Sequence, residues 1–160
     1  MIARRALLAA PAVLATRPVF ARAAPDEDMP REPWFIDSFL DLRDDLAAAT
    51  AAGKRLAVAW ELRGCPPCIA LHRLTLSTRE VAAFIPAFFD VIALDFAGAR
   101  EVTFPDGSTA TEKAMARRQN IAGPPTFQIF DPAGREARRL EGFVPPAVFL
   151  AAFRAATGRA

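Results

Sequence analysis

Both cysteines of the chain lie in the stretch Trp60-Glu61-Leu62-Arg63-Gly64-Cys65-Pro66-Pro67-Cys68-Ile69-Ala70-Leu71-His72. The apolar residues 56–60, which lead into this stretch, have the composition of a short buried strand. A helical pattern follows the second cysteine. A Cys-x-x-Cys pair at a strand-to-helix junction is typical of a dithiol/disulfide active site.

The composition fits one globular domain. The chain has 160 residues, 52% of them hydrophobic, which is enough for a single core. Two cysteines are too few for the scaffold of a small secreted domain, which needs several disulfides. They are compatible with one bridge, one redox pair or half of a metal site.

Residues 1–23 have the pattern of an export signal. Arg4-Arg5 forms a basic start, residues 6–16 are apolar, and Ala21-Arg22-Ala23 predicts cleavage after Ala23, with Ala24 as an alternative. The Arg pair also resembles a twin-arginine signal.

The alternative is an Ala-rich first helix of the domain, which Pro11 and Pro18 disfavour. The apolar run is shorter than the roughly 20 residues that span a bilayer. If the signal stayed uncleaved, it would anchor the chain to the membrane.

Export changes the charge argument. The whole chain has 20 Lys and Arg against 18 Asp and Glu, but residues 1–23 hold four arginines and no acid. The mature chain therefore has 16 basic and 18 acidic residues, a net charge of −2. The sequence thus predicts a periplasmic protein that does not bind nucleic acid, in a compartment that oxidises thiols.

The patterns predict a flexible lead-in over residues 24–34, which is rich in Pro and acidic residues, and one domain over residues 35–160. Helices are predicted over residues 37–52, from Cys65, from a cap at Ser77 or Thr78 to about Phe84, over 112–120 after a cap at Thr109 or Thr111, and from Pro145 or Pro146. Strands are predicted over residues 56–60, 89–94, 127–130 and 136–143. Residues 97–109 are predicted to be a surface insertion with a small β-hairpin near residues 102–104.

Two helix boundaries are argued from single residues. In the first helix, one apolar face is predicted, and Gly53 is expected to end it; the face consists of Phe35, Phe39, Leu42, Leu46 and Ala49. Pro86 is expected to stop the helix that Thr78 begins.

The order of elements sets the topology. The first two strands are joined through helices and are predicted to be parallel, with a right-handed crossover. The last two are joined by a tight turn and must be antiparallel. A mixed central sheet with helices on both faces follows, which places the chain in the α/β class.

These features together resemble the thioredoxin fold, and within it the exported SoxW-type thioredoxin-like proteins. The resemblance covers residues 35–156 and is carried by Cys65-Pro66-Pro67-Cys68 after a strand, Pro125-Thr126 before the next-but-one strand, and the hairpin and helix that end the chain. It implies a thiol:disulfide oxidoreductase that acts on protein disulfides, as a monomer, without a bound cofactor other than the Cys65–Cys68 redox disulfide. It also implies that Cys65 is the nucleophile, Cys68 the resolving thiol and Pro125 a cis-proline facing them.

The chemistry supports these assignments. A helix N-terminus favours the Cys65 thiolate, so that Cys65 is expected to be exposed with a lowered pKa and Cys68 to be more buried. Pro66 and Pro67 remove two backbone N–H groups from this terminus. The thiolate should therefore be less stabilised than in other Cys-x-x-Cys sites, which favours a reducing role.

The predicted substrate-binding residues are Pro124, Pro125 and Thr126. Topological placement predicts a cis bond before Pro125, although cis bonds are only about 5–6% of X–Pro bonds. Pro124 departs from the family pattern, because it offers an extended substrate a C=O but no N–H.

The residues around the cysteines also depart from that pattern. Ala59 stands where thioredoxins carry a buried aspartate, the proton acceptor for the resolving thiol, and Gly64 replaces the usual Trp. Glu61 is the candidate replacement acceptor, acting through water, although a solvated side chain is the favoured interpretation. Trp60 is expected to be a core residue.

His72 leaves an alternative open. Cys65, Cys68 and His72 offer two sulfurs and one nitrogen, the ligand types of a zinc or copper site, although a surface or partly packed histidine is favoured. Ile69 stands where a c-type haem site needs histidine.

Three hypotheses follow. The first is an exported reductant, supplied with electrons by a membrane dithiol relay of the DsbD, CcdA or SoxV kind, which acts on sulfur-oxidation, apocytochrome or other envelope clients. The second is a dithiol oxidase of the same fold. The third is a Cys/His metal-binding module.

Overall fold

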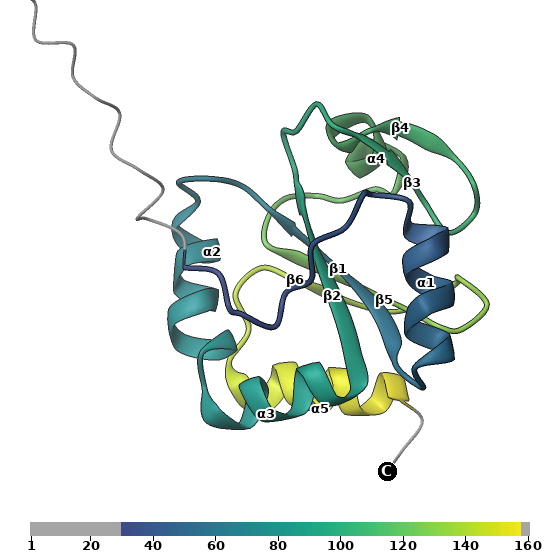
Figure 1. Ribbon diagram of the computed structural model, residues 1–160. Helices are drawn as coiled ribbons and strands as arrows, with labels where there is room; N and C mark the ends of the chain where they lie inside the picture. Colours follow the sequence, from purple (N-terminus) through teal and green to yellow (C-terminus); the bar gives the residue numbers. More distant parts are fainter. Residues whose placement is uncertain (1–29, 158–160) are drawn as a thin grey trace, which may run out of the picture.

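The computed structural model describes residues 30–157, so the predicted signal peptide and residues 24–29 of the lead-in lie outside the described residues. The central sheet has four strands in the order β2-β1-β5-β6 (Figure 1). Their bounds are β1 Arg55–Glu61, β2 Phe89–Asp95, β5 Thr126–Phe130 and β6 Glu136–Glu141. β1 and β2 are parallel, whereas β5 is antiparallel to both of its neighbours, which confirms the predicted mixed sheet.

Helices cover both faces of this sheet. They are α1 Leu42–Ala51, α2 Pro66–Leu71, the π-helix η1 His72–Leu76, α3 Arg79–Phe88, α4 Glu112–Arg118 and α5 Pro146–Thr157. α3 and α5 lie together below the sheet in Figure 1, and α1 lies at its other side. The π-helix, which continues α2 directly, was not predicted from the sequence.

The alternation of side chains along β1 divides the core in two. Ala57 and Ala59 face α2, η1, α3 and α5, where Phe149 and Phe153 pack. The intervening residues of β1 face α1, α4 and the insertion; they are Leu56, Val58 and Trp60. β1 is thus buried on both sides and holds its carboxyl end, Glu61, at a fixed place beside the cysteines.

The insertion forms the predicted hairpin, with strands β3 Glu101–Thr103 and β4 Thr109–Thr111. Gly107 has a φ of +82°, and the Asp106 carboxylate accepts a hydrogen bond from the Ser108 N–H. These are the turn features that the Asp-Gly pair predicts. Thr111 caps α4 through its hydroxyl, which accepts from the Ala114 N–H.

The prediction for the first helix is wrong at its start. α1 begins at Leu42, since the Asp41 side chain caps it by accepting from the Arg43 N–H. Leu40 has a φ of +65° and is buried, and this reversal turns Phe39 out into solvent. The helical spacing counted from residue 35 therefore does not apply before the cap. Gly53 follows the helix with a φ of +72°, as predicted.

The helix predicted to run to about Phe84 and to stop near Pro86 is longer than expected, because α3 continues through Pro86 to Phe88. Proline removes one backbone hydrogen bond from a helix interior. Here that loss falls only two residues before the helix gives way to β2, whose first residue is Phe89. Burial of Val81 and Ile85 against the sheet holds the helix in place.

The described part of the lead-in lies on the domain. Phe35 forms a β-bridge with Val91, and the Phe35 N–H donates to the Glu32 carbonyl at 3.1 Å. Glu32 is buried. The predicted flexibility of the lead-in therefore does not hold at Glu32.

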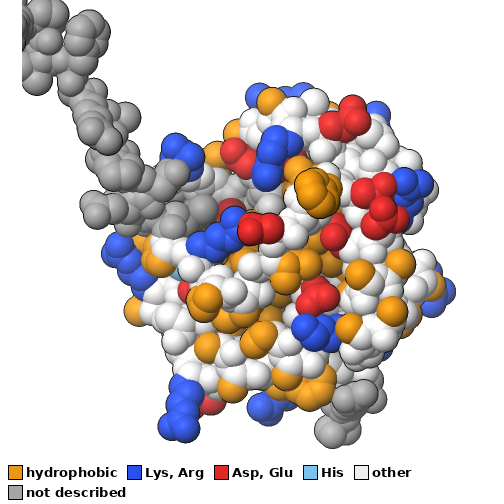
Figure 2. All heavy atoms as spheres, in the orientation of Figure 1, with side chains coloured by type: hydrophobic (Ala, Val, Ile, Leu, Met, Phe, Trp, Pro, Cys, Tyr) orange, Lys and Arg blue, Asp and Glu red, His pale blue; other side chains and the backbone are white. Residues whose placement is uncertain are grey.

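On the face shown in Figure 2, acidic and basic side chains are interspersed, and neither sign of charge dominates. This agrees with the nearly equal numbers of basic and acidic residues in the sequence, 20 and 18. Within residues 30–157, none of the helices is both long and apolar enough to cross a bilayer.

Candidate redox site

The two cysteines form a disulfide at the N-terminus of α2. Cys65 is the N-cap residue, and its N–H donates to the Leu62 carbonyl at 3.1 Å. Gly64 has a φ of +71°, a conformation that a glycine adopts without strain, so the chain can turn sharply from β1 into the helix. Cys65 keeps 8% of its exposure and Cys68 none. The predicted order of burial is confirmed, although Cys65 is less exposed than expected.

The first turn of α2 offers few donors to sulfur. Pro66 and Pro67 occupy its first two positions and have no N–H to give. The Cys68 N–H donates to Cys65 Sγ at 3.3 Å, while the Ile69 N–H donates to the Cys65 carbonyl at 3.1 Å. In the described structure, a Cys65 thiolate would therefore rest on one backbone donor of its own helix.

The loop before β5 faces the disulfide. The peptide bond between Pro124 and Pro125 is cis, as predicted, and the Pro124 carbonyl oxygen lies 3.8 Å from Cys65 Sγ. The Pro125 carbonyl accepts from the Gly142 N–H at 2.8 Å. Thr126 is buried, and its hydroxyl donates to the Gly123 carbonyl at 2.7 Å. Its side chain thus holds the loop, while substrate contact by residues 124–126 stays a prediction.

A buried polar cluster joins the end of β1 to the residue that directly follows α2. His72 Nε2 is 2.6 Å from Glu61 Oε1, and His72 Nδ1 is 2.5 Å from Glu32 Oε2. All three side chains are buried, with His72 only 1% exposed. The favoured interpretations of Glu61 as solvated and of His72 as a surface or partly packed residue are therefore wrong. Each is buried because it has an ionic partner.

The electrostatics of this cluster keep the imidazole charged. Burial alone lowers the pKa of His72, but the hydrogen bonds and charges of Glu32 and Glu61 outweigh it and raise that pKa to about 9. At neutral pH the cluster holds an imidazolium between two carboxylates.

His72 is not placed as the third ligand of the Cys65–Cys68–His72 metal site considered above. Both nitrogens of His72 are engaged by carboxylates, so neither is presented to the cysteines. Among residues 30–157, no group of three or more His, Cys, Asp or Glu side chains is arranged to hold a metal ion. The sulfurs are bonded to each other.

The sequence pointed to Cys65, Cys68 and Pro125 and offered Glu61 as a candidate, although a solvated Glu61 was favoured. It gave no indication of Glu32. Glu32 sits in an acidic, Pro-rich segment, whose pattern carries no sign of burial. The sequence feature that could have pointed to this cluster is His72, which lies one helical turn after Cys68 and needs an acidic partner if it is buried. Trp60 is a core residue as predicted, with its indole N–H donating to Gln128 Oε1 at 2.7 Å.

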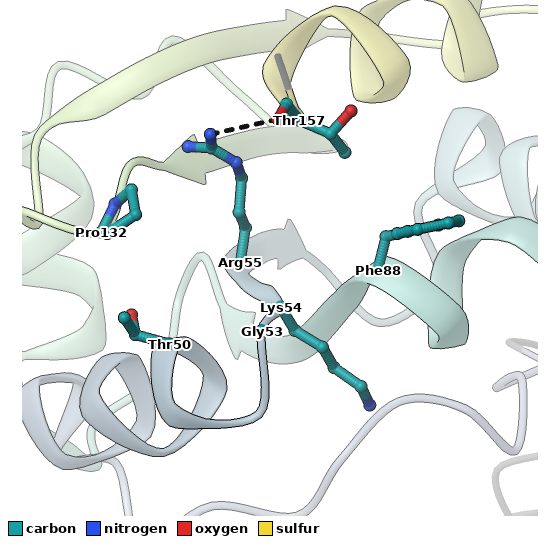
Figure 3. A pocket seen from close by; sticks show the side chains of 7 residues that line it. All are labelled: Thr50, Gly53, Lys54, Arg55, Phe88, Pro132 and Thr157. Carbon is teal, nitrogen blue, oxygen red and sulfur yellow. Dashed lines mark hydrogen bonds between the residues drawn. The ribbon is translucent and has the colours of Figure 1, made fainter. Parts of the chain in front are cut away.

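A hollow lies at the opposite end of β1 from Glu61 (Figure 3). Its lining includes Arg55, which donates to the Thr157 carbonyl at 3.4 Å, and Lys54, which pairs with Asp90 at 2.9 Å. Strand rise separates Arg55 from Glu61 by about 20 Å. The hollow is therefore not part of the redox site.

In this fold, a cis-proline faces a Cys-x-x-Cys disulfide, and this arrangement defines a thiol:disulfide oxidoreductase. The chain belongs to the thioredoxin-like family, since the family model described as a thioredoxin-like domain matches residues 42–157.

Solved structures with the same fold are similar to this chain. A thioredoxin structure from Thermus thermophilus has 30% identity and a TM-score of 0.56, covering 72% of this chain and 82% of that one. A thioredoxin-fold protein from Helicobacter pylori has 17% identity and a TM-score of 0.58, covering 82% of this chain and 78% of that one, which supports the fold alone.

Among curated proteins, the thiol:disulfide interchange protein DsbD from Ralstonia nicotianae is 32% identical over 126 residues. The match covers 78% of this chain but 19% of that protein. The likeness therefore concerns a small part of the relative's length.

Proposed function

We propose that this protein is a periplasmic, SoxW-type thioredoxin-like reductant that acts as a monomer on disulfides of envelope proteins. The export pattern of residues 1–23 supports the location. In an oxidising compartment, a dithiol that reduces its clients must be recharged.

The observation that supports a reducing role is the small number of backbone N–H groups that donate to Cys65 Sγ. A strong oxidant owes its potential to a stabilised thiolate in the reduced form. Here Pro66 and Pro67 leave the Cys68 N–H as the donor from the first turn of α2. The reduced form gains little stabilisation, the disulfide is favoured, and the dithiol gives its electrons readily.

The electron source would be a membrane dithiol relay of the DsbD, CcdA or SoxV kind. The likeness to a thiol:disulfide interchange protein supports a place in such a chain of exchanges. The candidate clients are sulfur-oxidation carriers, apocytochromes and other envelope proteins. An extended client segment would lie against the Pro124–Pro125 loop and expose its disulfide to Cys65.

The reduction potential tests this direction. Equilibration of the protein with thiol buffers should give a reduction potential of about −270 mV, as in thioredoxin. This differs clearly from the potential of DsbA, about −120 mV. Restoring an N–H with Pro66→Gly should raise the potential, while Pro86→Ala, in α3, should leave it unchanged. A wild-type potential above about −150 mV, or a measured Cys65 pKa near about 4, would instead favour the oxidase.

Clients and location need a separate experiment in the producing cell. Cys68→Ser should trap envelope proteins disulfide-linked to Cys65, and Cys65→Ser, tested in parallel, should trap none of them through that sulfur. The N-terminus of the mature protein should be Ala24. If Cys68→Ser captures no protein, or if the chain keeps residues 1–23 in the cytoplasm, the proposal fails.

A further inference from the structure

The buried cluster of Glu32, His72 and Glu61 joins three separate parts of the chain. Glu32 precedes the first helix, Glu61 ends β1, and His72 follows α2 as the first residue of η1. The two carboxylates bind the two nitrogens of one ring at 2.5 and 2.6 Å. Phe35 packs on this ring, with 5.8 Å between the ring centroids. Such a buried arrangement fixes the position of every member.

The cluster is close to the resolving cysteine. The His72 N–H donates to the Cys68 carbonyl, so the two residues are one helical turn apart. Side chains four residues apart on a helix have Cβ atoms about 5–6 Å from each other. Both side chains are buried, and Glu61 reaches the ring from β1. The Glu61 carboxylate therefore contacts the residue that lies one helical turn after Cys68.

The charges of the cluster do not balance. Glu32 and Glu61 act on the His72 ring, while Arg73 is exposed and so is Arg31, whose guanidinium lies 5.7 Å from the centroid of the Phe35 ring. An imidazolium neutralises one carboxylate and leaves a second negative charge buried. Such a charge attracts a proton, and the Cys68 thiol holds the proton that must leave during disulfide exchange.

We propose that His72 and Glu32 are positioning residues, which hold Glu61 in its buried place so that it accepts the Cys68 proton. The inference rests on the disulfide-exchange activity and applies to either direction of electron flow. Glu61, at the end of the same strand, would then supply the carboxylate that is missing at the position of Ala59.

The exchange consists of two successive attacks with one proton transfer between them. Cys65 thiolate attacks the substrate disulfide, a Cys65–substrate disulfide forms, and the first substrate thiolate leaves. The Cys68 proton passes through a water to Glu61. The Cys68 thiolate attacks Cys65 Sγ, the Cys65–Cys68 bond forms, and the second substrate thiolate leaves and takes up the proton. Two electrons go from the dithiol to the substrate.

The test separates the two attacks. The reduced protein is mixed with an aromatic disulfide reagent that releases one coloured thiolate when Cys65 attacks and another when Cys68 resolves the adduct. In Glu61→Gln the second release should slow by about 10²-fold, and in His72→Gln and Glu32→Gln by about 10-fold. The first release should stay within about twofold of wild type in all three. The pH midpoint of the second release should also shift in each variant.

Glu112→Gln is the matched control, because Glu112 is another buried glutamate, paired with Arg100 instead of His72. Both releases should be as in wild type. Glu61→Asp should recover part of the second rate, which a merely structural loss would not predict.

The proposal is overturned if folded Glu61→Gln resolves the adduct at the wild-type rate and pH midpoint, or if both releases slow equally. If Glu61→Gln does not fold, the same two criteria are applied to Glu32→Gln. The reduction potential is measured separately, so a failed proton acceptor and a failed reductant role are distinguishable.

Discussion

Two buried glutamates occupy comparable places at the carboxyl ends of neighbouring parallel strands, but their surroundings differ. Glu61 ends β1, and Glu112 accepts a hydrogen bond from the N–H of Asp95, the last residue of β2, at 2.9 Å. Glu112 also binds Arg100 Nη2 at 2.6 Å, so it has a guanidinium and backbone donors for one carboxylate. Glu61 instead shares one imidazole with a second carboxylate, Glu32.

The difference separates an anchor from a reactive group. Glu112 ties the insertion to the sheet, and Gly98 lets the chain pass close to it, since a Cβ there would overlap its carboxylate. Its charge is fully compensated. The Glu61 cluster has two carboxylates for one imidazolium, and a buried charge without a partner is costly. The cluster next to the cysteines is the unbalanced one.

Removal of the cation from the unbalanced cluster should have the largest effect on stability. His72→Gln leaves Glu32 and Glu61 buried without their shared positive charge. We expect the free energy of unfolding to fall by about 3–5 kcal/mol, measured by urea denaturation of the oxidised protein.

The matched control for this loss removes the charges together. Replacing Glu32 and Glu61 by Gln in the His72→Gln background should restore part of the stability, because no unpaired charge remains. An equal loss in the triple variant would mean that packing, and not charge, explains the effect.

The pH dependence should show the same cluster with a smaller effect. The pKa of His72 rises from 6.5 to about 9 on folding, so its contribution is fully present below pH 6.5 and is lost as the pH rises through about 9. The difference in unfolding free energy between wild type and His72→Gln should therefore shrink by about 3 kcal/mol from pH about 6 to pH about 10. Keeping the disulfide oxidised removes thiol titration, and a constant difference across this range would contradict the assigned charge state.

Much of the fold follows from the sequence because its signals are local. The strands at Leu56 and Phe127 are apolar runs between turn residues, and Thr111 and Gly53 mark helix ends with their own side chain or backbone freedom. The errors at Phe39 and Pro86 arise where tertiary packing overrides the local pattern.

The candidate site divides in the same way. Cys65, Cys68 and Pro125 are recognisable from spacing and order along the chain. The pairing of Glu32 with His72 joins residues 40 positions apart, and no local pattern encodes it. Glu61 was predicted to be solvated because a charged residue at the end of a strand is usually exposed, and only its distant partner explains its burial.

The smallest effect is expected when the cation is removed from the balanced cluster. Arg100 keeps 60% of its side-chain exposure, and exposed ion pairs contribute about 0–1 kcal/mol. In Arg100→Gln, Glu112 retains the N–H of Asp95 and the backbone N–H of residue 100, so the free energy of unfolding should fall by about 1 kcal/mol or less. Urea denaturation beside His72→Gln gives the direct comparison. A loss as large as that of His72→Gln would show that the two clusters depend equally on their cations, and the distinction between anchor and reactive group would no longer hold.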